Sequence, residues 1–316
     1  MILTVTLNPA LDRVMFIPRF VSGNANRIYR RENCIGGKGA HVSWNLIDLG
    51  VPSTATGVVM GPTGRQFLSA LGGAGVDCDF YEPADGGGDT RTNYIIVEDT
   101  GVCSLVCEKG PALTQAVLDA FLAFYEARAA KAEYIVVSGD ASNYATPEGL
   151  SFQTALLEIG RKHGAKVFLD ANGGSLREGV RSAPYLIKPN LQELSELTGM
   201  PTATERETVA AIRSLDAFGV YAVAASRGGD GSIVRIGDAF YRAGVAKIDY
   251  VNEVGCGDAY LAGLVCGLSS GWPAERTIAF ATACGGAEAE SPLTVGLDAA
   301  RVNALCDTVT VERMHV

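Results

Sequence analysis

The sequence predicts an α/β fold of the doubly wound type, built on a mostly parallel sheet. Short apolar runs alternate with longer amphipathic segments along most of the 316-residue chain, which is the pattern of strands joined by helices. Several short runs are apolar throughout, as expected for parallel strands buried on both faces. The strand–helix units share no fixed sequence period, so a solenoid is not expected.

The expected elements of this sheet follow from periodicity and from turn signals. Residues 110–132 carry apolar side chains along one face and predict a helix. Residues 146–164 begin with Thr-Pro-Glu and end with Lys-His-Gly, which are helix start and stop signals. The predicted strands are residues 2–7, 53–59, 134–139, 166–172, 185–190 and 221–226.

Two stretches interrupt this alternation and predict antiparallel hairpins. They cover residues 12–35 and 90–108, and the second turns at Asp-Thr-Gly, residues 99–101, between two β-branched runs. A glycine-rich entry at 83–89 precedes the second hairpin. Hairpins inserted near the front of an α/β domain predict a small separate sheet. Such a sheet could act as a lid or as an interface with a second subunit.

Composition excludes some classes of partner. Hydrophobic residues make up 47% of the chain and charged residues 19%, which is ordinary for a soluble globular protein. The net charge of −9 argues against nucleic acid or an anionic membrane as partner, because both need a basic face. A phosphorylated substrate remains compatible with this charge, since a few converging arginines can bind phosphate.

The sequence also predicts a cytoplasmic protein. The opening MILTVTLNPALDR has no basic region followed by a long apolar run, so no secretion signal is expected, and no apolar run is long enough to span a bilayer. The eight cysteines include no CxxC pair, and Cys103 and Cys107 have no matching pair that would complete a zinc site. We expect all eight to be buried thiols in a reducing compartment.

A first glycine-rich site is CIGGKGAHVSWNLIDLG, residues 34–50. Gly36, Gly37 and Gly39 allow the backbone to approach a ligand, and Lys38 adds a positive charge. The segment that follows is helical in pattern, so its first amides and its dipole point to the same place. The GxxxxGK[ST] spacing of a P-loop is absent. By itself this stretch fits a plain tight turn equally well.

A second glycine-rich site is VNEVGCGDAYLAGL, residues 251–264. Gly255 and Gly257 flank Cys256, and Asp258 leads into a segment that is apolar on nearly every face, so the helix should be buried. Its N-terminal amides then need partners. Asp258 fits a helix cap. It equally fits a general base beside amides that bind a transferring phosphoryl group.

Further candidates lie on both sides of this pair. In IKPNLQEL (187–194), Asn190 and Glu193 lie three residues apart at a helix start, which suits magnesium bound through water or a simple cap. ASRGGDGSIV (225–234) is a strand, a glycine turn and a second strand. Asp12 follows the first strand, where a carboxylate could accept two sugar hydroxyls. The hairpins carry polar side chains suited to an anion: Asn26, Arg27, Arg91 and Asn93.

Together these stretches resemble the ribokinase-like sugar kinases of the PfkB family, over essentially the whole chain and in order. GGKGAHVSWNLIDLG is similar to the family's N-terminal signature, and VNEVGCGDAYLAGLVCGL to its C-terminal one. TLNPALD, NANR and DTRTNY are similar to the branch of 1-phosphofructokinase, tagatose-6-phosphate kinase and minor 6-phosphofructokinase. The resemblance implies a three-layer α/β/α domain spanning 1–316, with lid hairpins inserted at about 12–35 and 88–108.

The resemblance also implies roles for individual residues. The aspartate of GxGD, here Asp258, is the family's catalytic base, and the residues around it form the transfer loop. N-x-x-E governs magnesium near the nucleotide, and SRGGDG is the nucleotide-binding turn. ATP and Mg²⁺ are thus implied, as is a homodimer formed through the lid. The implied sites are Gly255, Cys256, Gly257 and Asp258 for transfer; Asp12, Asn26, Arg27, Gly36, Gly37, Lys38, His41, Arg91, Asn93 and Asp140 for the sugar; and Lys188, Asn190, Glu193, Ser226, Gly228 and Gly231 for nucleotide and metal.

Three positions depart from that branch, and all lie on its acceptor side. His41 stands where the branch usually has Asn, Trp44 where it has Arg, and Asp140 where it has Ser. A histidine in place of an amide can still donate one hydrogen bond but cannot offer both amide groups. An added carboxylate would repel a sugar phosphate unless it is paired or turned away.

The sequence therefore predicts an ATP-dependent sugar-phosphate kinase, with fructose 1-phosphate as the first choice of acceptor. Tagatose 6-phosphate, fructose 6-phosphate, an unphosphorylated sugar and a nucleoside are the alternatives. A non-catalytic ligand sensor is a further alternative, although Asp258 and both flanking glycines are present. A dinucleotide-binding dehydrogenase is not expected, because no GxGxxG follows the first strand.

Overall fold

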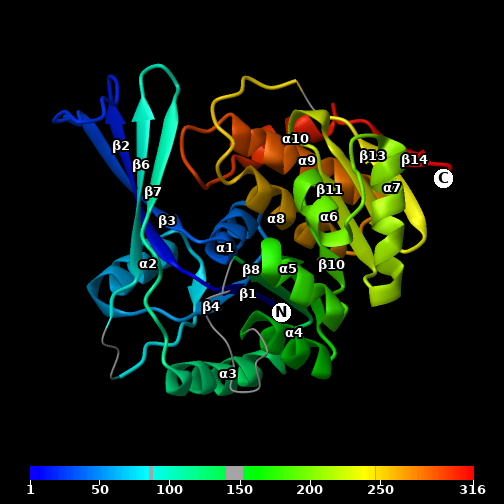
Figure 1. The fold of residues 1–316 in the computed structure, drawn as a ribbon, viewed down its shortest axis with the longest axis horizontal. Helices are drawn as coiled ribbons and strands as arrows, with labels where there is room; N and C mark the ends of the chain where they lie inside the picture. Colours follow the sequence, from blue (N-terminus) through cyan, green and yellow to red (C-terminus); the bar gives the residue numbers. More distant parts are fainter. Residues whose placement is uncertain (85–87, 140–151, 246) are drawn as a thin grey trace.

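The computed structural model describes residues 1–84, 88–139, 152–245 and 247–316. In this part of the chain, one large sheet forms the centre of the molecule (Figure 1). Seven neighbouring strands, from β11 to β5, run parallel, and the three strands at the other edge are antiparallel. In spatial order the strands are β14 (Val311–Met314), β13 (Ala239–Ala243), β12 (Ser232–Ile236), β11 (Ala222–Ser226), β10 (Leu186–Ile187), β9 (Lys166–Asp170), β8 (Tyr134–Ser138), β1 (Ile2–Thr6), β4 (Thr54–Gly57) and β5 (Asp77–Cys78).

All six strands predicted from the sequence are present. The central ones are buried on both faces, which explains why their sequences are apolar throughout. The segment 185–190 forms only a short strand, Leu186–Ile187, and Pro189 follows it without an amide hydrogen to donate.

Helices cover both faces of this sheet, so the molecule has the three layers that the sequence predicts. One apolar cluster joins one face of the strands to α3, α4, α5, α6 and α7, and a second joins the opposite face to α1, α8, α9 and α10. The helix α2 packs in a third cluster near β4. The helices are α1 (Lys38–Asp48), α2 (Gly61–Gly73), α3 (Gln115–Ala129), α4 (Phe152–Lys162), α5 (Gly173–Gly179), α6 (Leu191–Thr198), α7 (Glu205–Ser214), α8 (Cys256–Ser269), α9 (Ala274–Ala289) and α10 (Ala299–Cys306), with short 3₁₀ turns at Val180–Ser182, Leu215–Phe218 and Gly228–Asp230.

The two helices predicted with defined ends differ from the structure at their starts. The helix predicted at 110–132 begins at Gln115, because the hydroxyl of Thr114 caps it by accepting a hydrogen bond from the Val117 amide. The helix predicted at 146–164 is described from Phe152 to Lys162, and its predicted start lies outside the described residues.

A second, small sheet stands to one side of the main sheet (Figure 1). Its order is β3 (Arg30–Gly36), β2 (Ala10–Ile17), β6 (Arg91–Glu98) and β7 (Cys103–Cys107). Both predicted hairpins are confirmed, since β2 pairs with β3 and β6 with β7 in antiparallel fashion. Parallel pairing of β2 with β6 joins them into one sheet. We call this unit the lid sheet.

The chain path ties the lid sheet to the centre of the molecule. Only residues 7–9 separate β1 of the main sheet from β2, and Gly37 alone separates β3 from α1. The same covalent links therefore place the glycine-rich loop at 36–39 between the two sheets.

The expectation that all eight cysteines are buried is wrong. All eight thiols are free, but Cys103 and Cys107 are exposed, because β7 is the edge strand of the lid sheet and little packs on it. Cys78, Cys256 and Cys306 are half-buried. Within the described ranges, no helix combines the length and the apolar character that crossing a bilayer requires.

Candidate active site

A cleft of about 620 Å³ lies where the carboxyl ends of the central strands meet the lid sheet. Ligands of open α/β sheets bind at such strand ends. The cleft brings together residues from β2, β6, β7, β8, β9, the segment after β1 and the starts of α1 and α8. Its lining is Asn8, Asp12, Gly37, Lys38, His41, Arg91, Asn93, Ile95, Leu105, Cys107, Glu108, Lys109, Gly110, Ser138, Gly139, Asp170, Asn172, Lys188, Val254, Gly255, Gly257 and Asp258.

The start of the buried helix α8 forms one wall of this cleft. Its N-cap, Gly255, has φ +85°, and a Cβ there would collide with the carbonyl of Thr294, so glycine is required. No side chain caps the helix. The cap role that the sequence allowed for Asp258 is therefore not what the structure shows.

Two amides at this helix start lack an acceptor. The amides of Cys256 and Asp258 donate to the carbonyls of Glu253 (3.4 Å) and Gly255 (2.9 Å). Among the described residues the amides of Gly255 and Gly257 have no acceptor, and both residues line the cleft. Unpaired amides at a helix N-terminus favour an anion. Of the four residues that the resemblance implies for phosphoryl transfer, only Gly255 and Gly257 thus have an amide that is free to bind an anion.

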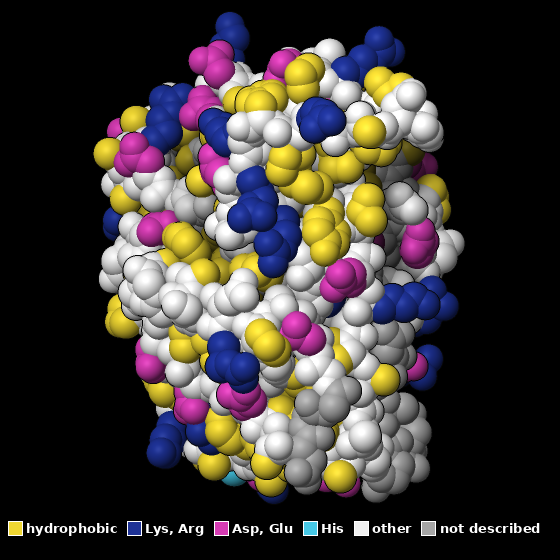
Figure 2. Space-filling view, turned by 90° about the vertical axis from the view of Figure 1, so that its left-hand side faces the viewer, with side chains coloured by type: hydrophobic (Ala, Val, Ile, Leu, Met, Phe, Trp, Pro, Cys, Tyr) yellow, Lys and Arg dark blue, Asp and Glu magenta, His cyan; other side chains and the backbone are white. Residues whose placement is uncertain are grey.

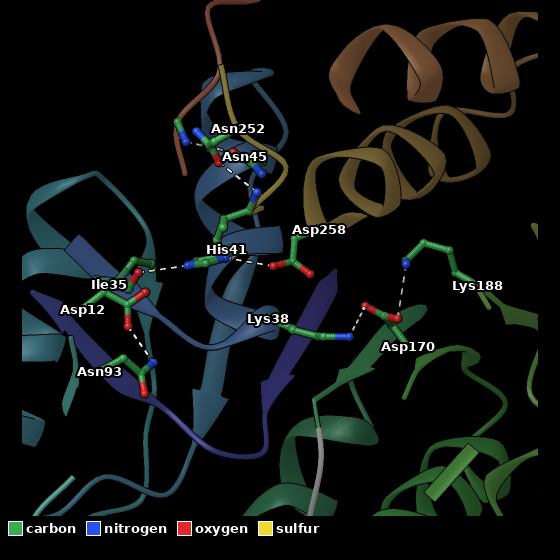
Figure 3. Close-up of polar contacts among 12 residues, drawn as sticks. Asp12, Ile35, Lys38, His41, Asn45, Asn93, Asp170, Lys188, Asn252 and Asp258 are labelled. Carbon is green, nitrogen blue, oxygen red and sulfur yellow. Dashed lines mark hydrogen bonds and ion pairs between the residues drawn. The ribbon is translucent and has the colours of Figure 1, made fainter. Parts of the chain in front are cut away.

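The Asp258 carboxylate contacts His41 on α1 (Figure 3). Its Oδ2 lies 2.8 Å from Nδ1 of His41, while Nε2 of the same ring lies 2.9 Å from the carbonyl oxygen of Ile35. His41 is only 5% exposed. Burial lowers the pKa of His41, but the hydrogen bond and charge of Asp258, with that of Asp12, outweigh it and raise the pKa to about 9.

Asp12 and Asn93 face each other from neighbouring strands of the lid sheet (Figure 3). The Asn93 amide donates to Oδ1 of Asp12 at 2.8 Å, and both side chains are buried. Burial raises the pKa of Asp12, although His41, Asn93 and Arg91 oppose the rise. Gly36 packs directly over the Asp12 carboxylate, so a Cβ at this position would collide with it. Asp12 thus lies on the cleft wall, as the sequence predicts.

Two lysines converge on one buried carboxylate, Asp170, at the end of β9. Lys38 Nζ lies 3.4 Å from Oδ2 and Lys188 Nζ 3.3 Å from Oδ1 (Figure 3). Burial raises the pKa of Asp170, but the two lysines more than compensate, and the net pKa is lowered. Lys188 also approaches Gly257 at the start of α8. Positive charge is therefore fixed beside the unpaired amides.

Arg91 lies in the cleft without a carboxylate partner among the described residues. Its guanidinium donates to the carbonyl of Asn8 at 3.1 and 3.3 Å, and more weakly to Asn93 Oδ1 and to the carbonyl of Glu108. These bonds fix the direction of the side chain but leave its charge unpaired.

Other predicted sugar-binding residues are not brought to the cleft. Asn26 and Arg27 lie in the exposed turn between β2 and β3, and the Asn26 side chain bonds within that turn, to Val21 and Asn24. Trp44 is half-buried against the cluster around α2 instead of lining the cleft. Asp140 lies outside the described residues.

The predicted nucleotide and metal residues lie beside the cleft rather than in its lining, except Lys188. Asn190 and Glu193 form a reciprocal capping box on α6, with bonds of 2.8 and 2.9 Å. Gly228 and Gly231 lie in the turn between β11 and β12, and Ser226, the last residue of β11, pairs with Asn190. The structure thus joins the two predicted segments.

The side chains near the cleft fit a magnesium ion whose ligands are mainly phosphate oxygens and water molecules. In the described ranges no group of three or more His, Cys, Asp or Glu side chains could hold a metal. The capping box uses Asn190 Oδ1 and Glu193 Oε2, so direct binding by Asn190 would compete with the cap. A single carboxylate acting through water is compatible with the box, because Mg²⁺ usually keeps several waters.

Several lining residues were missed from the sequence. Asn8 and Asp170 are polar residues at the carboxyl ends of predicted strands, which was the available signal. Glu288 on α9, which lies outside the cleft lining, carried no signal, because it lies within an ordinary helical pattern. It is fully buried, and neither carboxyl oxygen has a hydrogen-bond partner among the described residues.

The burial of Glu288 predicts that the protein loses stability as the pH rises. Burial raises its pKa from 4.5 to about 8, with His41 opposing and Asp258 adding to the rise. Between these values the unfolded chain releases this proton and the folded chain keeps it, so the free energy of unfolding falls as pH increases. We expect Glu288→Gln to raise the Tm at pH 8 and to change it little at pH 5. Each kcal/mol added to the free energy of unfolding should raise the Tm by roughly 2–4 °C.

The check is a series of thermal melts from pH 5 to 9. Glu275→Gln, an exposed position on the same helix, is the matched control and should show no rise confined to this range. A Tm difference between Glu288→Gln and the wild type that is independent of pH would contradict the assignment.

Comparison with known proteins identifies the family of this chain. Residues 5–298 match the family described as pfkB family carbohydrate kinase. The structure resembles a Thermotoga maritima protein described as a possible 1-phosphofructokinase (28% identity, 99% of each chain, TM-score 0.85). It shares the fold of Escherichia coli phosphofructokinase-2, solved with potassium (22% identity, 97% of this chain and 98% of that chain, TM-score 0.87) and in a tetrameric inhibited form (22% identity, 97% and 98%, TM-score 0.85). The chain therefore belongs to the pfkB family of carbohydrate kinases and is a sugar kinase.

Proposed function

We propose that this sugar kinase transfers the γ-phosphoryl group of ATP to a sugar phosphate, with fructose 1-phosphate as first choice and fructose 1,6-bisphosphate as product. The proposal depends on one observation: Asp258 and the two free amides at the start of α8 lie in the same cleft. Phosphoryl transfer depends mainly on positioning and on charge stabilisation, and this arrangement supplies both.

The proposed reaction is an in-line displacement. Asp258 accepts the proton of the sugar hydroxyl as that oxygen bonds to the γ-phosphorus, and the bond from phosphorus to the β–γ bridging oxygen breaks to release ADP. The proton later leaves Asp258 for solvent. The amides of Gly255 and Gly257 stabilise the charge on the transferring group, with Lys188 beside them.

Sugar and phosphate would bind on the lid side of the cleft. Asp12, held by Asn93, accepts sugar hydroxyls, and the loop at 36–37 closes over it. Lys38 and Arg91 attract the phosphate that the sugar already carries. This positive charge in a chain of net charge −9 supports a phosphorylated acceptor over a free sugar or a nucleoside.

The nucleotide would lie toward α6 and the β11–β12 turn. Gly228 and Gly231 lie in that turn and Ser226 ends β11, while Lys188 follows β10 and reaches toward the start of α8. Mg²⁺ would neutralise charge on the nucleotide phosphates, with Glu193 as its water-mediated protein partner. The family assignment supports ATP as donor.

Replacing Asp258 by Asn should lower kcat by about 10²–10⁴-fold, because the amide cannot accept the proton. Binding of the sugar phosphate, measured by calorimetry, should change little, since the side chain keeps its size. A coupled assay of ADP release measures kcat. A variant that retains wild-type turnover would show that Asp258 is not the base.

Replacing Arg91 by Ala should raise the KM for a sugar phosphate by about 10–100-fold, because a charge-assisted bond is worth roughly 1.5–3 kcal/mol. Arg65→Ala is the control, since Arg65 pairs with Glu82 at the surface. The assay panel comprises fructose 1-phosphate, tagatose 6-phosphate, fructose 6-phosphate, free ketoses and nucleosides. Equal KM values in wild type and Arg91→Ala, together with turnover of a free sugar or nucleoside, would favour the unphosphorylated acceptor.

We further propose that two copies of this chain associate through their lid sheets. Half of the large exposed hydrophobic side chains in the described residues lie on the lid sheet and its turns, and Figure 2 shows apolar side chains gathered on the face of the molecule that carries it. Such a gathering is typical of an interface. The members are Phe20, Val21, Ile28, Tyr29, Val102, Leu105 and Val106.

Charges introduced into this surface should separate the copies. The double variant Ile28→Asp/Val106→Asp leaves the cleft lining unchanged and should sediment as a monomer at concentrations where the wild type is a dimer. Phe218→Asp, an exposed hydrophobic outside the lid sheet, is the control and should stay dimeric. A wild-type chain that sediments as a monomer at all concentrations would contradict the proposed dimer.

A further inference from the structure

The proposed reaction assigns no role to the contact between His41 and Asp258. His41 projects from the first turns of α1 into the space between two acceptors (Figure 3). One is Oδ2 of Asp258 and the other is the main-chain carbonyl of Ile35. The ring is buried, so water does not compete for either nitrogen.

The hydrogen count at these two contacts constrains the charge. A carbonyl oxygen can only accept, so Nε2 must carry a hydrogen. A neutral ring would then present a lone pair on Nδ1 to the carboxylate oxygen 2.8 Å away, which is repulsive. A second hydrogen must therefore lie between His41 and Asp258, either on the ring or on the carboxyl group.

The surrounding charges decide which group holds it. Carboxyl groups face His41 from three elements: Asp12 on β2, Asp258 on α8 and Glu288 on α9. Lys38, on α1 itself, interacts with Asp258 from the cleft side. Cys34 on β3 is the remaining titratable neighbour, and burial raises its pKa to about 11, so it stays neutral. Glu288 keeps its proton below its pKa of about 8, so the negative charge comes from Asp258 and Asp12, and it favours the imidazolium form.

We propose that His41 is an imidazolium ion whose task is to keep the Asp258 carboxylate ionised and correctly oriented. The proposal rests on Asp258 as the base of the proposed reaction. By binding Oδ2, the ring leaves Oδ1 as the atom that takes the sugar proton, and Oδ1 has no hydrogen-bond partner among the described residues.

His41 is thus a positioning residue and not a proton relay. Its Nε2–H is bound to a carbonyl that cannot accept a proton covalently, so no path leads from the ring to solvent. The ring keeps its charge through the catalytic cycle, and the proton taken from the sugar remains on Asp258 until it leaves through the cleft.

Histidine NMR tests the charge without any assay of activity. The chain has three histidines, so ¹⁵N-labelled rings give few signals, and His41→Asn identifies the one that matters. We expect both nitrogens of His41 to be protonated from pH 6 to 8, with titration near pH 9. In Asp258→Asn the ring should be neutral at pH 7. A ring that carries a single proton at pH 7 in the wild type would overturn the proposal.

Kinetics test the consequence for the base. In His41→Asn we expect kcat to fall about 10–100-fold, because the catalytic carboxylate is then misplaced. The KM for the sugar should change by less than about threefold, because the loss is one of orientation of the catalytic group. The acid limb of the pH–rate profile should move to higher pH, because a cation beside a carboxylate favours its ionised form. His163→Asn, which removes a surface histidine paired with Glu126, is the matched control and should keep the wild-type profile.

The two experiments distinguish a failure of the proposed function from a failure of the proposed role of His41. Absence of turnover with every acceptor would refute the proposed function, while the NMR signals would still report on the His41–Asp258 pair. A folded His41→Asn variant with wild-type kcat and an unshifted acid limb would overturn the positioning role. Should that variant fail to fold, the titration of His41 in the wild type still decides its charge.

Discussion

The buried N-terminus of α8 is the constraint on which the site depends. A helix that is apolar on nearly every face must lie in the core, and its first amides are then shielded from water. No side chain caps them, and two remain without an acceptor among the described residues. Unmet donors in such a place favour an anion. The fold thus leaves two free donors, suited to an anion, at the start of an uncapped helix.

Charges around this position are arranged in two groups. On one side, Lys38 and Lys188 share Asp170, which fixes two cations near the helix start while a carboxylate offsets part of their charge. On the other side, His41 lies among the carboxyl groups of Asp12, Asp258 and Glu288. The two lysines therefore lie toward the start of α8, and the carboxyl groups of Asp12, Asp258 and Glu288 surround His41.

The lid sheet carries both the proposed sugar-binding residues and the proposed subunit contact. Asp12, Asn93 and Arg91 face the cleft from β2 and β6, whereas the turns and the edge strand β7 expose apolar side chains. Only short links join this sheet to β1 and α1, so the same sheet reaches from the cleft to the exposed surface. Arg27, which lies in an exposed turn, is too far along the hairpin to line the cleft of its own chain.

The sequence by itself determined the layers, the parallel sheet, both hairpins and part of the cleft lining, because these depend on local periodicity, glycine spacing and the order of strand ends. It predicted Asp258 and Asp12 at the cleft for the same reason. It could not decide between a cap and a base at Asp258, or place His41 against that carboxylate, because residues 217 positions apart meet only through the packing of α1 on α8. The burial of Glu288 and the convergence of two lysines on Asp170 are likewise tertiary. Charge state follows from which groups surround a side chain in space, and that is decided only when the helices pack.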